Sequence, residues 1–285
     1  MAQPNTYAHC EALVGAADKD RYLASLFAPA AARQHLYALY AFASEIARVR
    51  DAAREPLPGE IRLQWWRDVL AGEGRGEVSA NPVAAALLDT VARCALPRER
   101  LIALIDAHAF DLYDDAMASL ADLDTYAEHT SGTLFALAAQ ILGGTDRADA
   151  IVAAAAPPAG IAYGVAQRLR TFPSDLARRQ LFVPVDLLAQ HGVTREEIEA
   201  RQNAAGLRGA LAALRDHARA AFGGFLAAAP DIPEACAPAF VVTALVPPLL
   251  ARLDAAAADP FATVDVPQWR RQWALWRAAR RWPKV

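Results

Sequence analysis

Residues 36–51 read Leu-Tyr-Ala-Leu-Tyr-Ala-Phe-Ala-Ser-Glu-Ile-Ala-Arg-Val-Arg-Asp, and this stretch decides the fold class. Its apolar side chains recur every three or four residues, so they fall on adjoining faces of one helix. The same period returns in residues 65–70, 101–112 and 134–141. No run alternates apolar and polar residues for long enough to form a convincing strand. The pattern predicts an all-α protein, in which one helix runs from about Ala30 through Asp51.

Composition supports one globular domain. Of the 285 residues, 55% are hydrophobic, and alanine, the best helix former, supplies much of that fraction. The formal net charge of -3 argues against a dedicated nucleic-acid-binding protein, so we expect no nucleic acid partner. No repeat or linker divides the chain, which predicts a single domain over residues 1–285.

Cysteine usage and the termini bear on location. The three cysteines have no regular spacing, which predicts reduced thiols in a cytoplasmic compartment rather than disulfides. The N-terminus shows no secretory signal. Residues 235–251 are uncharged but contain three prolines and are shorter than the ~20 residues of a typical membrane span. We interpret them as a buried helix of the bundle.

Proline and glycine predict the breaks between helices, at residues 56–59, 143–144 and 157–158. The run Gly-Glu-Gly-Arg-Gly at 72–76 predicts a loop. It lacks the preceding strand and the following Lys-Ser/Thr of a phosphate-binding loop.

Several segments resemble the signature regions of squalene and phytoene synthases. Tyr-Leu-Ala-Ser-Leu-Phe-Ala-Pro at 22–29 and residues 36–42 resemble the opening of those enzymes. Leu169-Arg170, Ala-Arg-Arg at 177–179 and Leu-Phe-Val-Pro at 181–184 resemble their second signature region. We identify the chain as a member of this superfamily. The resemblance implies an isoprenoid synthase-type helical bundle around a central apolar cavity.

The resemblance also implies where chemistry would occur. Those enzymes carry two Asp-x-x-x-Asp motifs that face each other across the cavity mouth. Carboxylates at i and i+4 share one helix face, and Mg²⁺ binds such oxygen ligands together with a substrate diphosphate. The metal neutralises the leaving diphosphate, so that an allylic cation can form.

This chain departs from both motifs. Ala47 stands at the leading position of the first motif, and Asp51 matches the trailing one. Thr171 stands at the leading position of the second motif, and Asp175 matches the trailing one. One carboxylate per motif should bind Mg²⁺ much more weakly, because removing a residue that merely supports a metal ligand already costs about 10–100-fold.

Two further positions change in the same regions. Ser44 replaces an arginine of the family, and Gln167 replaces an asparagine that binds metal. Arg48 and Arg50 add positive charge where the enzymes gather negative charge. We therefore expect no cofactor and assign no catalytic residue. If the chain were active, Mg²⁺ would be held by Asp51 and Asp175, with Asp111 as a further candidate ligand and Tyr126 nearby. The degenerate motif positions are Ser44, Ala47, Asp51, Gln167, Thr171 and Asp175.

A literal Asp-x-x-x-Asp also occurs at Asp111 and Asp115. It is a weak candidate for a displaced metal site. We interpret it instead as a solvated helix face near the cavity mouth.

A narrower resemblance points to the superfamily branch typified by a mitochondrial assembly factor of respiratory complex I. It rests on residues 42–50, 62–67, 126–130, 169–173 and 182–194. The last segment, Phe-Val-Pro-Val-Asp-Leu-Leu-Ala-Gln-His-Gly-Val-Thr, matches that branch better than it matches the enzymes. The resemblance implies that the partners are complex I subunits or assembly intermediates.

The C-terminal residues 265–285 predict a helix rich in tryptophan and arginine. Trp269, Trp273 and Trp276 recur at i, i+4 and i+7, beside arginines that include Arg270 and Arg277. Such a helix can lie at a membrane interface or dock a partner. The alternative is a closing helix of the bundle whose tryptophans point inward.

Three hypotheses for function follow. The first is a non-catalytic factor in complex I assembly, whose cavity holds a prenyl chain or lipid. The second is a Mg²⁺-dependent prenyl transferase that condenses two prenyl diphosphates head to head. The third is a lipid-binding membrane scaffold. The expected location is cytoplasmic, with peripheral association with the inner membrane if the C-terminal helix is an anchor.

Overall fold

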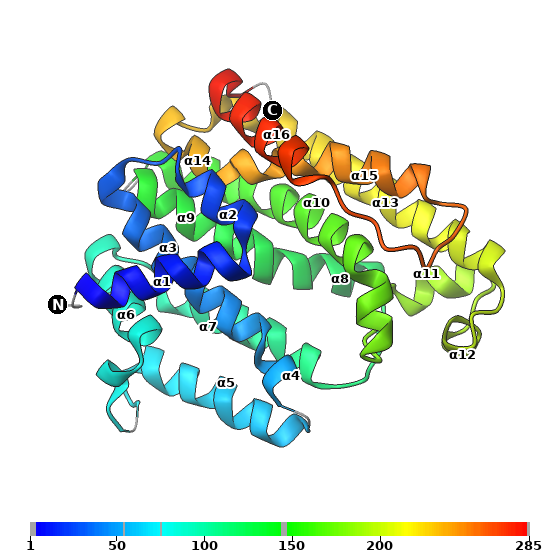
Figure 1. The fold of residues 1–285 in the computed structure, drawn as a ribbon, viewed down its shortest axis with the longest axis horizontal. Coiled ribbons are helices and arrows are strands. Elements are labelled where there is room, and N and C mark those ends of the chain that lie inside the picture. Colours follow the sequence, from blue (N-terminus) through cyan, green and yellow to red (C-terminus); the bar gives the residue numbers. More distant parts are fainter. Residues whose placement is uncertain (1–3, 54, 75, 144–146, 284–285) are drawn as a thin grey trace.

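The computed structural model confirms the all-α fold class (Figure 1). It describes residues 4–53, 55–74, 76–143 and 147–283. In that part of the chain, β pairing is limited to one isolated bridge between Ala116 and Leu181. The α-helices are α1 (Pro4–Ala17), α2 (Lys19–Ser25), α3 (Ala30–Ala47), α4 (Val49–Ala52), α5 (Pro56–Ala71), α6 (Pro82–Cys94), α7 (Arg98–Ala109), α8 (Leu120–Ala127), α9 (Thr133–Gly143), α10 (Arg147–Ala177), α11 (Val185–Gln190), α12 (Arg195–Glu199), α13 (Ala204–Ala228), α14 (Ala237–Phe240), α15 (Val246–Ala255) and α16 (Gln268–Arg281). Shorter turns are the 3₁₀ segments η1 (Val78–Ala80), η2 (Phe110–Leu112), η4 (Ala229–Asp231), η5 (Glu234–Cys236) and η6 (Val241–Leu245), and the π-helical turn η3 (Glu128–Gly132).

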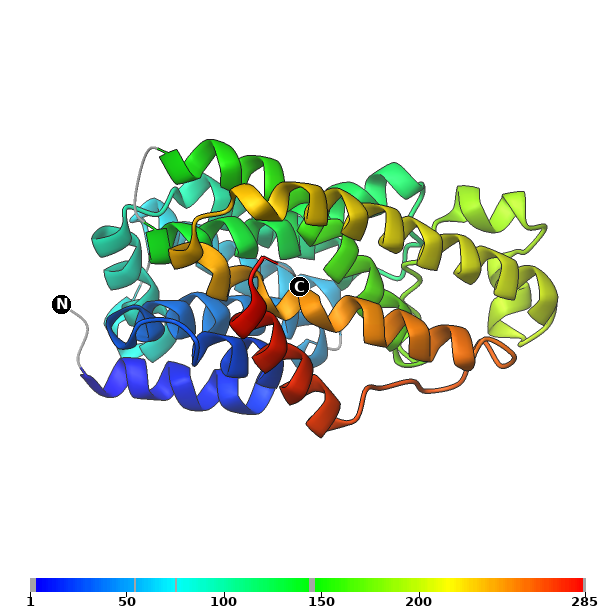
Figure 2. The same cartoon turned by 90° about the horizontal axis from the view of Figure 1, so that it is seen from above.

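Two helices organise the bundle. The long helix α10 packs along α13 and also contacts α8, α9 and α15, while α3 packs against α1, α6 and α9. The apolar period of α3 fills the core, since Leu36, Leu39 and Phe42 are fully buried. Seen from above, α16 crosses the outside of the bundle obliquely (Figure 2). The two central helices carry the two degenerate motif regions.

The helix predicted to continue through Asp51 ends earlier. Helix α3 stops at Ala47, Arg48 leaves the helical region with φ -96° and ψ 3°, and a separate turn of helix, α4, carries Asp51. The prediction of one uninterrupted helix was therefore wrong. As a consequence, Ala47 and Asp51 do not share one continuous helix face.

The break predicted at Pro157-Pro158 was also wrong. Both prolines lie inside α10, which runs for 31 residues. Proline removes one backbone hydrogen bond and usually kinks or ends a helix. Here tertiary packing of α10 against α9, α13 and η3 overrides that local preference. The loop predicted at 72–76 fits its described residues, because Gly72 and Gly76 have φ values of 83° and 81°. Gly144 of the predicted break at 143–144 lies outside the described residues.

The apolar stretch near the C-terminus is buried, as predicted, but it is not one regular helix. Residues 234–255 divide into η5, α14, η6 and α15. By length and composition, Glu234–Ala255 is the one described segment that could cross a membrane, yet 61% of its most apolar window lies inside the bundle. Phe240 and Leu249 belong to the core. We therefore interpret this segment as part of the core of the bundle.

Helix α10 approaches the π-helical turn η3 very closely at two glycines. A Cβ atom on Gly160 would lie 2.5 Å from the Cα and the backbone nitrogen of Gly132. Because the neighbour is backbone, the clash cannot be relieved by a rotamer change. This contact fixes the distance between α10 and η3, the turn that follows the helix α8 that carries Tyr126.

We therefore expect Gly160→Ala to lower the free energy of unfolding by about 1–3 kcal/mol or more, because overpacking forces backbone shifts. The matched control is Gly223→Ala in α13, where nothing lies within 4 Å of the added Cβ. That exposed substitution should raise stability by about 0.5–1 kcal/mol. Urea unfolding followed by circular dichroism measures both. Equal stability of the two variants would contradict the close approach.

Candidate functional site

A cavity of about 490 Å³ opens between α2, α3, α10 and α16. Helix α3 contributes Tyr40 and Ala43, α10 contributes Tyr163 and Gly164, and η3 contributes Thr130 to its wall. The cavity lies where the family resemblance places the substrate site. The wall is not mainly apolar, because charged side chains from four segments reach into it.

The six motif positions divide into two groups. The four positions that have lost the residue of the family line the cavity, whereas the two that keep an aspartate do not. Asp51 lines a separate cleft of about 300 Å³ together with Glu45 and Arg62. Asp175 is 5% exposed and faces the core beside Phe172 and Phe182. The lining positions are Ser44, Ala47, Gln167 and Thr171.

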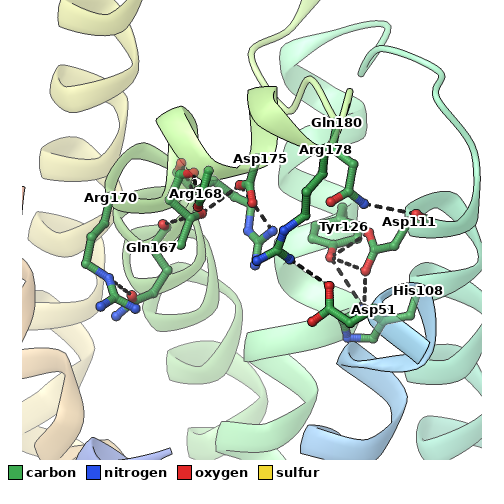
Figure 3. A network of polar contacts seen from close by, with 12 residues as sticks. Asp51, His108, Asp111, Tyr126, Gln167, Arg168, Arg170, Asp175, Arg178 and Gln180 are labelled. Atoms are coloured by element: carbon green, nitrogen blue, oxygen red, sulfur yellow. Dashed lines mark hydrogen bonds and ion pairs between the residues drawn. The ribbon is translucent and has the colours of Figure 1, made fainter. Parts of the chain in front are cut away.

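Asp51 is held by an arginine from the second motif region. The Arg178 guanidinium donates to Asp51 Oδ1 across 2.9 Å (Figure 3). The pair connects α4 to the end of α10 directly. Both side chains are about half exposed, so the pair adds little to stability. Its consequence is electrostatic, because a cation of the chain already occupies this carboxylate.

Asp175 is satisfied within α10. Thr171 donates its hydroxyl to Asp175 Oδ2 across 2.6 Å, and Arg168 Nη1 lies 3.5 Å from the same oxygen. Burial raises the pKa of the Asp175 carboxyl, while Arg168 and the Thr171 hydrogen bond oppose that rise. Thr171, at the leading motif position, thus donates its hydrogen bond to Asp175, at the trailing position of the same motif. The Asp175 side chain has no free face toward the cavity.

The other degenerate positions are also engaged locally. Gln167 accepts a hydrogen bond from Arg170 Nε across 2.8 Å. Ser44 donates to the backbone oxygen of Tyr40 across 2.8 Å. Arg50 donates to the backbone oxygen of Leu112 across 2.6 Å, which joins α4 to η2.

The interpretation of Asp111 and Asp115 as a solvated helix face was wrong. Asp111 is 8% exposed, whereas Asp115 is exposed. The helical segment ends at Leu112 and Tyr113 is extended, so the two aspartates share no helix face. The spacing in the sequence therefore does not make a metal-binding pair.

Asp111 instead belongs to a buried cluster. His108 Nδ1 lies 2.6 Å from Asp111 Oδ2, and the Tyr126 hydroxyl donates to the carboxylate across 3.1 Å. Gln180 donates to the backbone oxygen of Asp111 (Figure 3). Burial, followed by the charge of Asp111, raises the pKa of Tyr126 well above its ordinary value, so this hydroxyl stays protonated. His108 and Tyr126 also line the cavity, which places the cluster in its wall.

These residues do not fit a magnesium cluster. Mg²⁺ requires several hard oxygen ligands in near-octahedral geometry. Thr171, Gln167 and Ala47 stand where the family has charged or amide ligands. The remaining aspartates, Asp51 and Asp175, form contacts with other side chains of the protein instead. Within the described residues, no three His, Cys, Asp or Glu side chains are grouped so that they could share an ion. The chemistry of the side chains themselves therefore argues against metal-assisted ionisation of a diphosphate here.

The cavity wall is instead strongly basic. Described side chains that line it include six lysines and arginines but two aspartates. The Arg21 guanidinium lies over the rings of Tyr40 and Tyr163, at 5.6 and 5.1 Å from their centroids. Burial lowers the pKa of Arg21, but the charge of Asp18, the neighbouring Tyr163 and Tyr40 and the hydrogen bond to Asp18 together raise it overall. The basic residues are Lys19, Arg21, Arg48, Arg168, Arg170 and Arg271.

Sequence reasoning missed the run Asp-Lys-Asp-Arg at 18–21, which supplies four of the lining residues. Asp18 caps α2, because its side chain accepts from the backbone N–H of Arg21 across 3.0 Å. Asp20 is 4% exposed and forms a two-pronged ion pair with Arg271 of α16, with 2.9 Å between Oδ1 and Nε. The sequence signal that could have identified this run was the helix-capping pattern after α1. The partner of Asp20, 251 residues away, had no sequence signal.

The C-terminal helix does not turn its tryptophans inward. Trp269, Trp273 and Trp276 are 64%, 58% and 43% exposed, whereas Leu275 and Ala278 are buried. The alternative of a closing helix with inward tryptophans was therefore wrong. Helix α16 begins at Gln268, directly after Pro267.

Comparison with known proteins places these features in context. The model of the squalene/phytoene synthase family matches residues 14–277. "NADH dehydrogenase (ubiquinone) complex I, assembly factor 6" from Rattus norvegicus is 36% identical over 195 residues, which are 68% of this chain and 57% of that protein. This chain thus spans a little over half the length of that relative. Phytoene synthase from Thermus thermophilus is 31% identical over 204 residues, covering 70% of this chain and 67% of the enzyme.

A solved structure agrees with these matches. Squalene synthase HpnC from Alicyclobacillus acidocaldarius superposes with a TM-score of 0.73 and 25% identity, covering 90% of this chain and 96% of that one. The predicted isoprenoid synthase-type fold, the resemblance to the family and the narrower likeness to the assembly-factor branch are confirmed.

The Asp20–Arg271 pair yields a stability prediction. Arg271→Met should lower the free energy of unfolding by about 3–5 kcal/mol, because it leaves a buried carboxylate without its partner. The double variant Asp20→Leu with Arg271→Met should recover most of that loss, since no buried charge remains. Arg67→Met, which breaks the exposed pair with Asp106, is the control and should cost about 1 kcal/mol or less. Chemical denaturation measures all three, and a small effect of Arg271→Met alone would refute the buried-pair argument.

Proposed function

Because this chain belongs to the squalene/phytoene synthase family yet lacks the family's metal ligands, we propose that it acts without prenyl transfer, as a factor in respiratory complex I assembly. The observation that carries the proposal is the division of the motif positions. Each motif position that faces the cavity has lost the residue that the family carries there, and each retained aspartate is paired with another side chain of the protein. The matches to complex I assembly factors support the proposed role in complex I assembly.

The physical argument against prenyl transfer concerns charge. Ionisation of a prenyl diphosphate needs Mg²⁺ to neutralise the leaving group, and Mg²⁺ needs carboxylates that hold it. In this cavity Arg48, Arg168 and Arg170 would repel a divalent cation. A Mg²⁺-dependent transferase therefore has the wrong local charge, and this second hypothesis is disfavoured.

The partners we propose are complex I subunits or their assembly intermediates. The family fold gives a rigid helical body whose outer surface is available for protein contacts. The cavity would then serve for binding rather than for reaction. If the outer surface contacts proteins and the cavity only binds a ligand, the bundle is still needed, but the motif positions no longer have to carry catalytic residues.

We also propose that the cavity holds an anionic amphiphile, a lipid or prenyl chain with a phosphate head. Arginine binds phosphate with two parallel hydrogen bonds and needs no metal as an intermediary. Arg170 and Arg48 supply such groups, while Leu134 and the tyrosine rings offer an apolar surface for the first part of a chain. The basic wall thus replaces the metal cluster as the anion-binding element.

The function is tested by enzyme assay and by genetics together. Purified protein with farnesyl or geranylgeranyl diphosphate and Mg²⁺ should release no diphosphate, while a phytoene synthase assayed in parallel does. Deletion of the gene should lower assembled complex I, and the Asp51→Asn variant should restore it as well as the wild type does, because Asp51 has no catalytic task. Robust diphosphate release, or an unchanged level of complex I after deletion, would refute the proposal.

The ligand is tested by thermal shift without metal. Farnesyl monophosphate should raise the melting temperature equally in EDTA and in Mg²⁺, whereas farnesol should raise it much less. Saturation at about 100 times Kd corresponds to about 2.7 kcal/mol of added stability. Arg170→Gln should reduce the shift, and Arg100→Gln, an exposed arginine outside the cavity, should leave it unchanged. A shift that requires Mg²⁺ would contradict direct binding by arginine.

A further inference from the structure

The outer face of α16 carries an aromatic ridge of unusual exposure. Trp269, Trp273 and Trp276 are its members, and the last two stack with their ring centroids 5.0 Å apart. At about 3.6 residues per turn, these three positions fall on one narrow stripe. The buried Leu275 and Ala278 lie on the opposite side of the helix. Large apolar rings therefore point straight away from the bundle, where a soluble helix normally presents polar groups.

Basic side chains surround this ridge. Helix α16 contains five arginines and no acidic residue, in a chain whose formal net charge is -3. Arg271 faces inward and forms the ion pairs with Asp20 and Asp265. In the described part of the chain, no ion pair is recorded for the other four, and all are exposed. They are Arg270, Arg277, Arg280 and Arg281.

The arginines and tryptophans are arranged together. The Arg270 guanidinium lies 5.1 Å from the ring centroid of Trp269, and that of Arg280 lies 5.5 Å from the ring centroid of Trp276. These contacts hold the charges at the level of the rings. The aromatic rings and the arginine charges therefore lie side by side in one strip along the axis of α16.

We propose that α16 docks the protein on an anionic phospholipid bilayer, lying parallel to its surface. Tryptophan rings favour the headgroup region, where one part of the ring is apolar and the indole N–H is hydrated. Unpaired arginines next to them complement the phosphates of anionic lipids. A protein partner would need an acidic and apolar groove of matching length, whereas a bilayer offers both properties along the whole strip. This inference goes beyond the proposed function, because it concerns where the protein resides and not what it assembles.

The opposite side of α16 borders the cavity. Gln268 and Arg271 line the cavity wall, and Arg271 fastens the helix to α2 through Asp20. The docking strip and the cavity thus share one helix, which is rigidly attached to the bundle. Docking by the outer face would leave the inner contacts of α16 unchanged.

Vesicle flotation of the full-length chain tests the proposal. The protein should float with vesicles that mix phosphatidylcholine and phosphatidylglycerol, remain unbound with phosphatidylcholine alone, and be released by high salt. Replacing Trp269, Trp273 and Trp276 together by alanine should lower the partition coefficient by about tenfold or more, because the apolar surface that inserts is lost. The control replaces Leu57 and Ile61 by alanine. These residues are 64% and 63% exposed on α5, and their removal should change binding less than twofold.

A second pair of variants tests whether binding depends on the arginines of α16 or on the positive charge of the protein in general. Gln substitutions at Arg270, Arg277 and Arg280 should abolish the preference for anionic vesicles. Gln substitutions at three exposed arginines on other helices should preserve it. Those control positions are Arg100, Arg208 and Arg252.

Independent measurements keep the result interpretable. Brominated phospholipids should quench the tryptophan fluorescence of the wild type on anionic vesicles, and circular dichroism should show that all variants are folded. Failure of the folded wild type to float, or equal flotation of the triple tryptophan variant, would overturn the proposal. So would a wild-type dimer that becomes a monomer in that variant, because the strip would then be a contact between two copies. Complex I plays no part in these assays, so their outcome is independent of the proposed assembly function.

Discussion

Aspartates around the central cavity are neutralised by side chains of the same protein, and one buried aspartate, Asp20, holds α2 against α16. Asp20 joins α2 to α16 through Arg271, and Asp51 joins α4 to the end of α10 through Arg178. Asp175 is held within α10 by Thr171 and Arg168. Burying a carboxylate is costly unless it is paired, so the buried Asp20 favours the contact between α2 and α16 that brings Arg271 to it. A carboxylate that is already paired with a cation of the chain attracts a divalent cation less strongly.

This constraint fits the proposal that the family fold persists here without metal chemistry. The resemblance to prenyl synthases implies that metal ions lie between the two motif regions in those enzymes. Here Arg178 supplies a permanent positive charge between the same two regions. The basic residues that remain in the cavity wall favour an anion bound directly. Under the proposed function, the fold keeps a polar site at the same place, and this site binds an anion directly instead of metal with diphosphate.

Helix α16 illustrates how one element can serve two surfaces. Its inner side carries Arg271, whose charge is paired with the buried Asp20, and its outer side carries tryptophans and arginines in solvent. Hydrophobic periodicity alone cannot tell which side faces the core, because tryptophan suits either a bundle interior or a membrane interface. The ion pair with Asp20 orients the helix, since rotating α16 would leave that carboxylate buried without a partner.

The sequence by itself determined the helical class, the family and the degenerate motif positions, because these depend on short-range periodicity and on residue identity at aligned positions. It could not decide where α3 would end, that Pro157 would lie inside α10, or that Asp111 would be buried while Asp115 stays exposed. Those outcomes depend on packing between distant segments, which overrides local preference. Only the tertiary structure placed Asp20 against Arg271 and turned the retained aspartates away from the cavity, since charge pairing across 251 residues leaves no local signature.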